Sequence, residues 1–176
     1  NLNKTAGITF EFADEITKSG KGVTTLYNDS QYFNFSNTTL NNFLNNNSDC
    51  IFDKLPSDLR DQIKQVNKNV VRNTGKIWEL SSYKTKLFPL AHDEITTVKS
   101  EYAMEGEGTT YEYYVMNDND EARKKTAIGG DTNHYWLRSP ALVSGAQDSW
   151  CVYVRGDLGH SWYTSVKMAV APAFCI

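Results

Sequence analysis

Aromatic, imidazole and charged side chains gather near the end of the chain, among turn-forming residues. Aromatic side chains give a large contact area at a small cost in conformational entropy, while Arg and Asp give a contact its direction. This composition favours a binding face over a reaction centre. The predicted contact residues are His134, Gln147, Asp148, Trp150, Tyr153, Arg155, Asp157, His160, Trp162 and Tyr163.

Large aromatic residues also dominate protein cores, so each of these rings has a structural alternative. Trp136 lies in the run from 135 to 140, YWLRSP, where a core position is favoured. Arg138 in the same run is expected to be a framework residue that binds carboxylates or loop carbonyls with its rigid fork of donors. The run is therefore interpreted as framework rather than as part of the binding face.

The positions of the remaining rings depend on where strands and turns fall. Gly159, His160 and Ser161 have the composition of a hairpin tip, which favours exposure of the following Trp162 and Tyr163.

Neighbours on a strand point to opposite faces of a sheet. For the adjacent residues Trp150 and Cys151, we therefore expect only one to be buried.

Two short acidic segments could do other chemistry. His92, Asp93 and Glu94 could act in acid–base catalysis, but acidic side chains at a helix start also offset the helix dipole, and this interpretation is favoured. The segment 117–121 has oxygen ligands at the alternate spacing that calcium uses, yet it lacks the glycine and distant glutamate of an EF-hand. As a turn and helix cap it needs no metal. We expect no catalytic residues, no cofactor and no metal.

The three cysteines, Cys50, Cys151 and Cys175, do not have the spacing of a zinc site. Cys151 and Cys175 both lie in strand-like runs. They could form a disulfide in an exported protein, or they could be separate buried apolar residues.

Length and charge exclude several classes of protein. The chain has 176 residues and a net charge of −3, with both signs scattered. A nucleic-acid-binding face would need clustered Lys and Arg, so no nucleic-acid partner is expected. The apolar runs are too short to span a bilayer, so we expect no membrane insertion by this segment. Because the chain begins at Asn1 rather than Met, we expect it to be a piece of a longer protein.

The hydrophobic pattern predicts an α+β domain, with two to three helices early and a β-rich C-terminal half. Strands are expected at 7–12 and 23–27, around a turn at 20–22. Helices are expected from Thr38 or Thr39 to Asn46, and from Pro56 through Val66. Residues 70–71 and 77–80 are expected to pair, and 111–116 fit a helix or a strand. From Tyr135 onward, every element is expected to be a short strand.

Six motifs together resemble a bacterial and phage family of uncharacterised domains. They read LNNFLNNN, LPSDLRDQI, KLFPLAHDEI, YWLRSP, VYV and VAPAF, and they span about 30–176 in the family's order. The resemblance implies a domain at 30–176, with 1–29 as an N-terminal extension or hairpin. That family looks like a branch of the C-type-lectin fold, related to formylglycine-generating enzymes and to retroelement-diversified variable proteins.

The resemblance implies a ligand surface on the C-terminal strands, and an extracellular place on a bacterial surface or phage tail. The expected partner is a protein or glycan on another cell or surface. The chain lacks the Glu-Pro-Asn and Trp-Asn-Asp motifs of calcium-dependent lectins. Formylglycine-generating enzymes use two nearby cysteines, whereas Cys151 and Cys175 are far apart in sequence. A degenerate enzyme of that type, or a structural spacer, remains the alternative to a binding domain.

Overall fold

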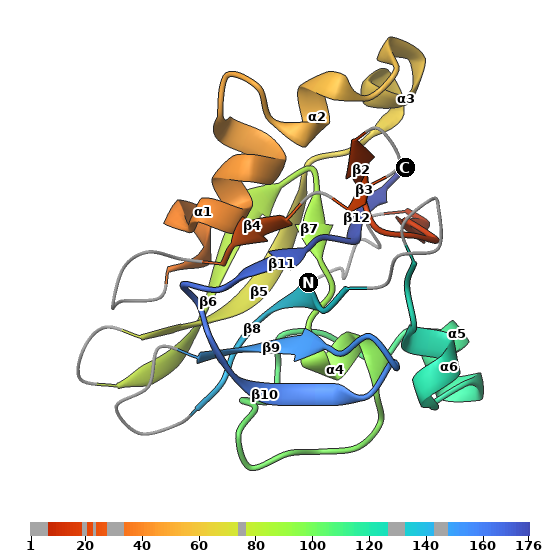
Figure 1. Cartoon of the computed structure of the whole chain (residues 1–176). Coiled ribbons are helices and arrows are strands. Elements are labelled where there is room, and N and C mark those ends of the chain that lie inside the picture. Colours follow the sequence, from red (N-terminus) through yellow and green to blue (C-terminus); the bar gives the residue numbers. More distant parts are fainter. Residues whose placement is uncertain are drawn as a thin grey trace.

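A computed structural model describes residues 7–18, 21–22, 24–27, 34–73, 77–126, 133–142 and 148–176. Over these residues the chain is a β-rich α+β structure with short helices, as the hydrophobic pattern predicts (Figure 1). No helix in the described part of the chain has both the length and the apolar character to cross a membrane.

The largest sheet is built mainly from the C-terminal part of the chain. Its strand order is β10, β9, β8, β11, β4. β9 lies antiparallel between β8 and β10, while β11 pairs parallel with β8 and antiparallel with β4. The bounds are β4 Thr24–Leu26, β8 Tyr135–Pro140, β9 Asp148–Val152, β10 Leu158–Tyr163 and β11 Lys167–Ala169.

A second sheet joins the two ends of the described chain. β12 (Pro172–Cys175) lies between β1 (Thr9–Glu11) and β7 (Phe88–Pro89), antiparallel to both. Together with β4, β1 ties the N-terminal segment to the last two strands of the fold. A small antiparallel pair, β2 (Thr17–Lys18) and β3 (Lys21–Gly22), lies between them in sequence.

The predicted pairing of 70–71 with 77–80 is confirmed. β5 (Val66–Asn73) and β6 (Trp78–Thr85) form a long antiparallel hairpin in which Val71 is opposite Leu80. In Figure 1 this hairpin lies behind the strands of the largest sheet.

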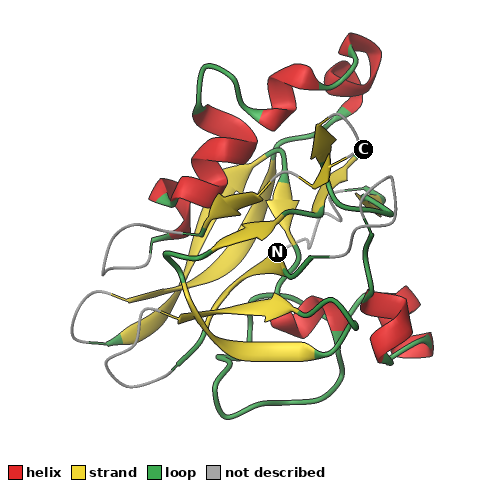
Figure 2. Cartoon of the chain, in the orientation of Figure 1, coloured by secondary structure: helices red, strands yellow, loops and turns green. Residues whose placement is uncertain are grey.

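The early helices gather at one end of the molecule, as the red ribbons in Figure 2 show. Thr38 caps the first α-helix, as predicted, because its side chain accepts from the backbone N–H of Asn41 at 3.1 Å. The elements are a 3₁₀ turn η1 (Phe35–Asn37), α1 (Thr39–Asn41), a π turn η2 (Asn42–Asn46), α2 (Ile51–Lys54) and α3 (Ser57–Gln62).

The helix expected to run through Val66 ends at Gln62 instead. The backbone N–H of Lys64 donates to the carbonyl of Cys175 at 2.9 Å, and Val66 begins β5. Pairing with distant strands therefore overrides a local apolar spacing that is helical. The later helices are α4 (His92–Ile95), α5 (Glu112–Met116) and α6 (Asp120–Arg123).

The core lies on both faces of the C-terminal strands. Along β8, Tyr135 and Leu137 belong to one buried cluster and Trp136 to the other, as the alternation of a strand requires. Trp150 and Cys151 also divide between the two clusters, and they are 3% and 0% exposed. The prediction that only one of them is buried is wrong, because this sheet is covered on both faces.

Candidate functional site

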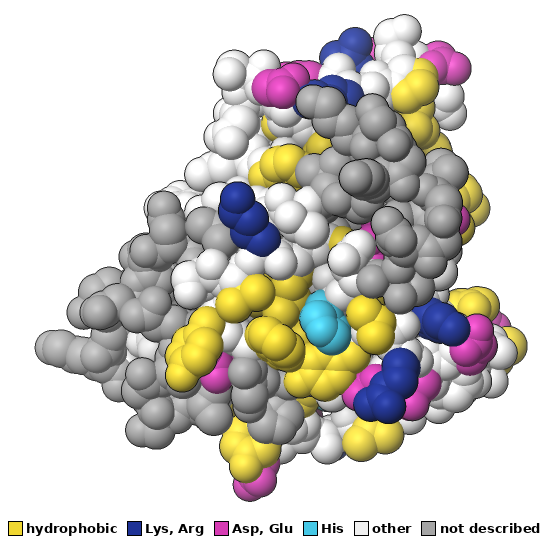
Figure 3. Space-filling model, in the orientation of Figure 1, with side chains coloured by type: hydrophobic (Ala, Val, Ile, Leu, Met, Phe, Trp, Pro, Cys, Tyr) yellow, Lys and Arg dark blue, Asp and Glu magenta, His cyan; other side chains and the backbone are white. Residues whose placement is uncertain are grey.

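Three rings from separate segments meet on one side of the largest sheet. His134 precedes β8, Tyr153 follows β9, and Trp162 lies in β10. Ring centroids are 5.0 Å apart for His134 and Tyr153, 5.3 Å for His134 and Trp162, and 6.3 Å for Tyr153 and Trp162. We call these three residues the ring cluster. In Figure 3, hydrophobic side chains gather around a histidine over this part of the molecule.

Backbone hydrogen bonds fix the positions of His134 and Tyr153. The carbonyl of His134 accepts from the N–H of Ala169 on β11 at 2.9 Å. Tyr153 begins the turn between β9 and β10, where its N–H donates to the carbonyl of Asp157 at 2.8 Å. Gly159 lies directly beneath the Tyr153 ring, and a Cβ at this position would overlap that ring. The glycine therefore permits a close approach of ring to backbone.

The hairpin tip is at 153–157, not at 159–161 as predicted. Gly156 has φ +94°, a left-handed conformation that suits glycine, and its N–H donates to the carbonyl of Tyr153 at 2.8 Å. Its carbonyl accepts from Nε of Arg123 at 3.1 Å, which fastens the tip to α6. The segment 159–161 lies inside β10, at an irregularity where the pairing register with β9 shifts.

Two polar atoms at the ring cluster keep unused hydrogen-bonding capacity. Nδ1 of His134 and Oδ1 of Asp157 are buried and have no hydrogen-bond partner among the described residues. Burial lowers the pKa of His134, although the Asp157 carboxylate acts to raise it. The neutral imidazole this favours at pH 7 has one N–H donor and one acceptor nitrogen. Buried polar groups normally have partners, so these two atoms are exceptions within the described part of the chain.

The other predicted contact residues divide into exposed and buried groups. Tyr163 is 64% exposed, and the Arg155 side chain is 84% exposed, with its Nε 3.7 Å from Oδ1 of Asp157. Both lie close to the ring cluster in sequence and are open to solvent. Gln147 lies outside the described residues, as does the side chain of His160.

Asp148 and Trp150 are corrections to the predicted face, because the core buries them. Asp148 is 7% exposed and Trp150 is 3% exposed. The indole N–H of Trp150 donates to the carbonyl of Tyr102 at 3.1 Å, and its ring centroid lies 4.3 Å from that of His92. The loop carrying Tyr102 thus covers the sheet face on which Trp150 lies.

Arg138 is a framework residue, as predicted, and it is fully buried. It pairs with Glu94 and also donates to the carbonyls of Asn69, Pro89 and Glu107, at 3.1, 3.1 and 2.7 Å. Burial alone would raise the pKa of Glu94, but Arg138 and Lys68 hold it below its ordinary value. The arginine therefore joins β5, β7, α4 and the loop around residue 107.

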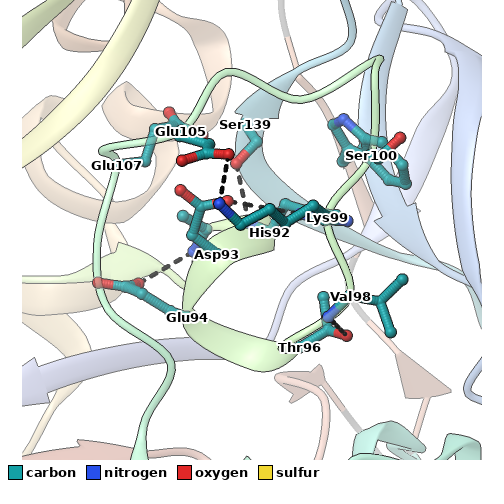
Figure 4. A network of polar contacts seen from close by, with 12 residues as sticks. His92, Asp93, Glu94, Thr96, Val98, Lys99, Ser100, Glu105, Glu107 and Ser139 are labelled. Carbon is teal, nitrogen blue, oxygen red and sulfur yellow. Dashed lines mark hydrogen bonds and ion pairs between the residues drawn. The ribbon is translucent and has the colours of Figure 1, made fainter.

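The segment 92–94 starts a helix, as expected, and Glu94 also belongs to the framework around Arg138. The Glu94 carboxylate accepts from the N–H of Ala91 at 3.0 Å, and the N–H of His92 donates to Oγ of Ser139 at 2.9 Å (Figure 4). In the following loop, Glu107 is buried and accepts from the N–H of Val71 at 2.9 Å. Burial raises the pKa of Glu107 to about 7.

The segment 117–121 is a helix cap. Asn119 accepts from the N–H of Ala122 at 3.0 Å, and Asp118 accepts from the N–H of Thr97 at 2.7 Å. Asp118 also pairs with Arg123 at 2.6 Å. Protein donors thus already occupy these oxygens. Within the described ranges there is no group of three or more His, Cys, Asp or Glu side chains that could hold a metal ion.

All three cysteines are buried and free. Cys151 belongs to the buried cluster that contains Trp136, whereas Cys175 belongs to the one that contains Trp150. Burial raises the pKa of Cys151 to about 12. A thiol becomes a nucleophile or metal ligand as the thiolate, so this environment does not favour cysteine chemistry.

A cavity beside β1 has no counterpart among the features predicted from sequence. It has a volume of about 550 Å³, and its lining includes Glu11, Tyr114 and Lys125. Tyr114 donates to Glu11 across 103 positions of sequence. No local motif could have shown this grouping, because residues from opposite parts of the chain form it.

A family model described as a domain of unknown function, DUF6273, matches residues 14–176. The match covers most of the chain, so the chain belongs to this family. Comparisons with curated proteins and with solved structures find no match.

Proposed function

We propose that this DUF6273 member is a non-enzymatic ligand-binding domain with a C-type-lectin-like fold, and that its binding face is the ring cluster. The observation that carries the proposal is the meeting of His134, Tyr153 and Trp162 at a partly exposed site. Because Gly159 has no side chain, the Tyr153 ring can pack directly against the backbone. Rings fixed in this way lose little conformational entropy on binding.

The favoured ligand is a glycan on another cell or surface. A sugar ring has apolar C–H faces that can lie against aromatic rings, and hydroxyl groups that donate and accept hydrogen bonds. The side chains of Asp157 and Arg155, which are 35% and 84% exposed, can supply the hydrogen bonds for a ligand of this chemistry. The alternative ligand is a protein with an exposed hydroxyl-bearing or aromatic patch, and the test must distinguish it from a glycan.

The proposed contact set is smaller than the one predicted from sequence. It keeps the ring cluster and Asp157, with Arg155 and Tyr163 at its solvent-exposed rim. Rim residues contribute less to affinity than residues at a desolvated centre. Asp148 and Trp150 are left out because they belong to the core.

We propose that the protein acts outside the cell, on a bacterial surface or phage tail. This follows from the resemblance of the motifs from 30 to 176 to the bacterial and phage family. The same resemblance makes a retroelement-diversified variable protein part of the proposal. A degenerate formylglycine-generating enzyme is not favoured, because Cys151 and Cys175 are buried in different clusters.

The test is binding of the labelled chain to an array of bacterial surface polysaccharides and, in parallel, to an array of surface proteins. Tyr153→Ala and Trp162→Ala should each weaken binding about thirtyfold or more, the loss expected of a hot-spot residue. Trp78→Ala is the matched control, since Trp78 is also a partly buried tryptophan beside the same core cluster, on β6. It should leave binding unchanged.

Thermal unfolding of the same three variants separates binding from folding. If Tyr153→Ala and Trp162→Ala fold and bind every ligand as the wild type does, the ring cluster is not the binding face. Binding only to proteins, lost in the same two variants, would keep the face and replace the glycan with a protein ligand.

A further inference from the structure

The cavity beside β1 lies apart from the ring cluster in its lining residues. Thr9 and Glu11 of β1 form part of it, and the segment of 111–114 at the start of α5 forms another part. Ala122 of α6 and the two lysines that follow, Lys124 and Lys125, also line it. Its volume of about 550 Å³ is in the range of small-molecule sites. In Figure 1, α5 and α6 lie together at one side of the sheets.

One carboxylate in this cavity is largely buried and only half satisfied. The Glu11 side chain is 17% exposed. Its Oε2 accepts from the hydroxyl of Tyr114 at 2.6 Å and lies 3.2 Å from Nζ of Lys125. Its Oε1 has no hydrogen-bond partner among the residues that the structure describes. Because Glu11 lines the cavity, this oxygen is placed to accept from a donor supplied by a ligand.

The ammonium group of Lys125 is shared between Glu11 and a backbone carbonyl. Its Nζ also donates to the carbonyl of Phe12 at 2.9 Å, so it is fixed at the wall of the cavity. Burial raises the pKa of Glu11, while Lys125 and the Tyr114 hydroxyl act to lower it. A second positive charge at Oε1 would therefore hold the carboxylate in its ionised form.

The cavity has one more acidic than basic side chain. Its carboxylates are those of Glu11, Glu112 and Glu121, and its ammonium groups are those of Lys124 and Lys125. Lys124 pairs with Glu121 at 3.7 Å, and Lys125 pairs with Glu11. Glu112 has no ion-pair partner within the described part of the chain. The excess of negative charge selects against an anionic ligand and for a cation.

Aromatic rings supply the apolar part of the wall. Tyr111, Tyr113 and Tyr114 all line the cavity, and Tyr113 is 57% exposed. The face of a tyrosine ring attracts cations and packs against apolar groups. The cavity thus combines an acceptor for a charged donor with a surface for a hydrocarbon or aromatic group.

We propose that this cavity binds a small organic cation, whose primary ammonium group donates to Oε1 of Glu11 and whose apolar part packs against Tyr111 and Tyr113. The site is distinct from the proposed glycan-binding face, so either can fail without the other. Ammonium, neutral and anionic versions of one ligand should differ clearly in affinity, because a hydrogen bond between charged groups is about twice as strong as a neutral one.

The experiment is NMR titration of the ¹⁵N-labelled chain with benzylamine, benzyl alcohol and benzoate. Benzylamine should shift the amides of Glu11, Glu112 and Lys125 saturably, and bind about tenfold or more tightly than benzyl alcohol. Benzoate should not shift them. Equal binding of all three compounds, or no saturable shift at these amides with benzylamine at about 10 mM, would overturn the proposal.

Two variants and one control test the assignment of residues. Glu11→Gln keeps the size of the side chain and should abolish the preference for benzylamine over benzyl alcohol. Glu101→Gln is the matched control, because this exposed glutamate does not line the cavity, and it should bind as the wild type does. If Glu11→Gln does not fold, Ala122→Leu fills the cavity instead and should abolish benzylamine binding. Unchanged benzylamine binding in either folded variant would place the ligand elsewhere.

Discussion

Replacement of the buried arginine should show how much the framework of this fold depends on one side chain. In Arg138→Met, the apolar stem of the side chain is kept and the guanidinium is lost. The change removes the partner of Glu94 and the donors to three backbone carbonyls, those of Asn69, Pro89 and Glu107. These carbonyls belong to segments that the sequence places far apart.

The expected cost follows from the groups left without partners. Breaking a buried ion pair by removing one member costs about 3–5 kcal/mol. Glu94 keeps its contacts with Lys68 and with the N–H of Ala91, which reduces the loss, whereas the three carbonyls add to it. We therefore expect a loss of about 4 kcal/mol in the free energy of unfolding, and a fall in Tm of about 8–16 °C for a chain of this length.

The assay is urea unfolding followed by circular dichroism, supported by a thermal scan. Arg155→Met is the matched control, because the Arg155 side chain is 84% exposed, and its effect should stay within about 0.5 kcal/mol. A second variant, Arg138→Lys, keeps the charge but not the planar fork, so it should recover only part of the lost stability.

The pH dependence supplies a second readout. The pKa of Glu94 is lowered in the folded chain. Its contribution to the free energy of unfolding is therefore present above the unfolded pKa and is lost as pH falls through the folded pKa. Arg138→Met should weaken this acid sensitivity. A loss of less than about 1 kcal/mol at pH 7, with the acid sensitivity unchanged, would refute the view that this network holds the segments together.

Two further predictions concern Glu107 and Gly159. Burial raises the pKa of Glu107 to about 7, so its contribution is complete below the unfolded pKa and is lost as pH rises through about 7. Glu107→Gln should therefore remove a decline in stability between about pH 4.5 and 7, on the order of 3 kcal/mol, and urea unfolding at several pH values that still shows this decline would contradict the assignment. Gly159→Ala should displace the Tyr153 ring and weaken glycan binding, while Gly108→Ala, whose Cβ would instead meet Glu94, should leave the ring cluster in place. Chemical shifts of the Tyr153 ring protons that match the wild type in Gly159→Ala would show that the ring does not depend on this glycine.

Local patterns found most of the elements but not all of their ends. Thr38 marked its helix start because a side-chain cap acts within a few residues. The spacing of Val66 from Leu59 and Ile63 predicts a helix, but Val66 begins β5, because its strand partner Thr85 is distant in sequence. The residue types around Gly159 predict a turn, because a glycine needed for a close approach looks the same in sequence as one needed for a turn.

The candidate site shows the same division. His134, Tyr153 and Trp162 could be named from their chemistry, but Asp148 and Trp150 share that chemistry and lie in the core. Trp150 is buried because the loop that carries Tyr102 covers this face of the sheet, and only the tertiary structure shows this. No sequence motif indicates the cavity that Glu11, Tyr114 and Lys125 line.

The sequence by itself determined the α+β class, the strand-rich end, and the framework character of Trp136 and Arg138. These follow from periodicity, capping and side-chain chemistry, which act over a few residues. Only the tertiary structure decided which aromatic rings are exposed, where the hairpin turns, and which charges meet in a cavity. These depend on what covers each face of a sheet, and the covering segments come from distant parts of the chain.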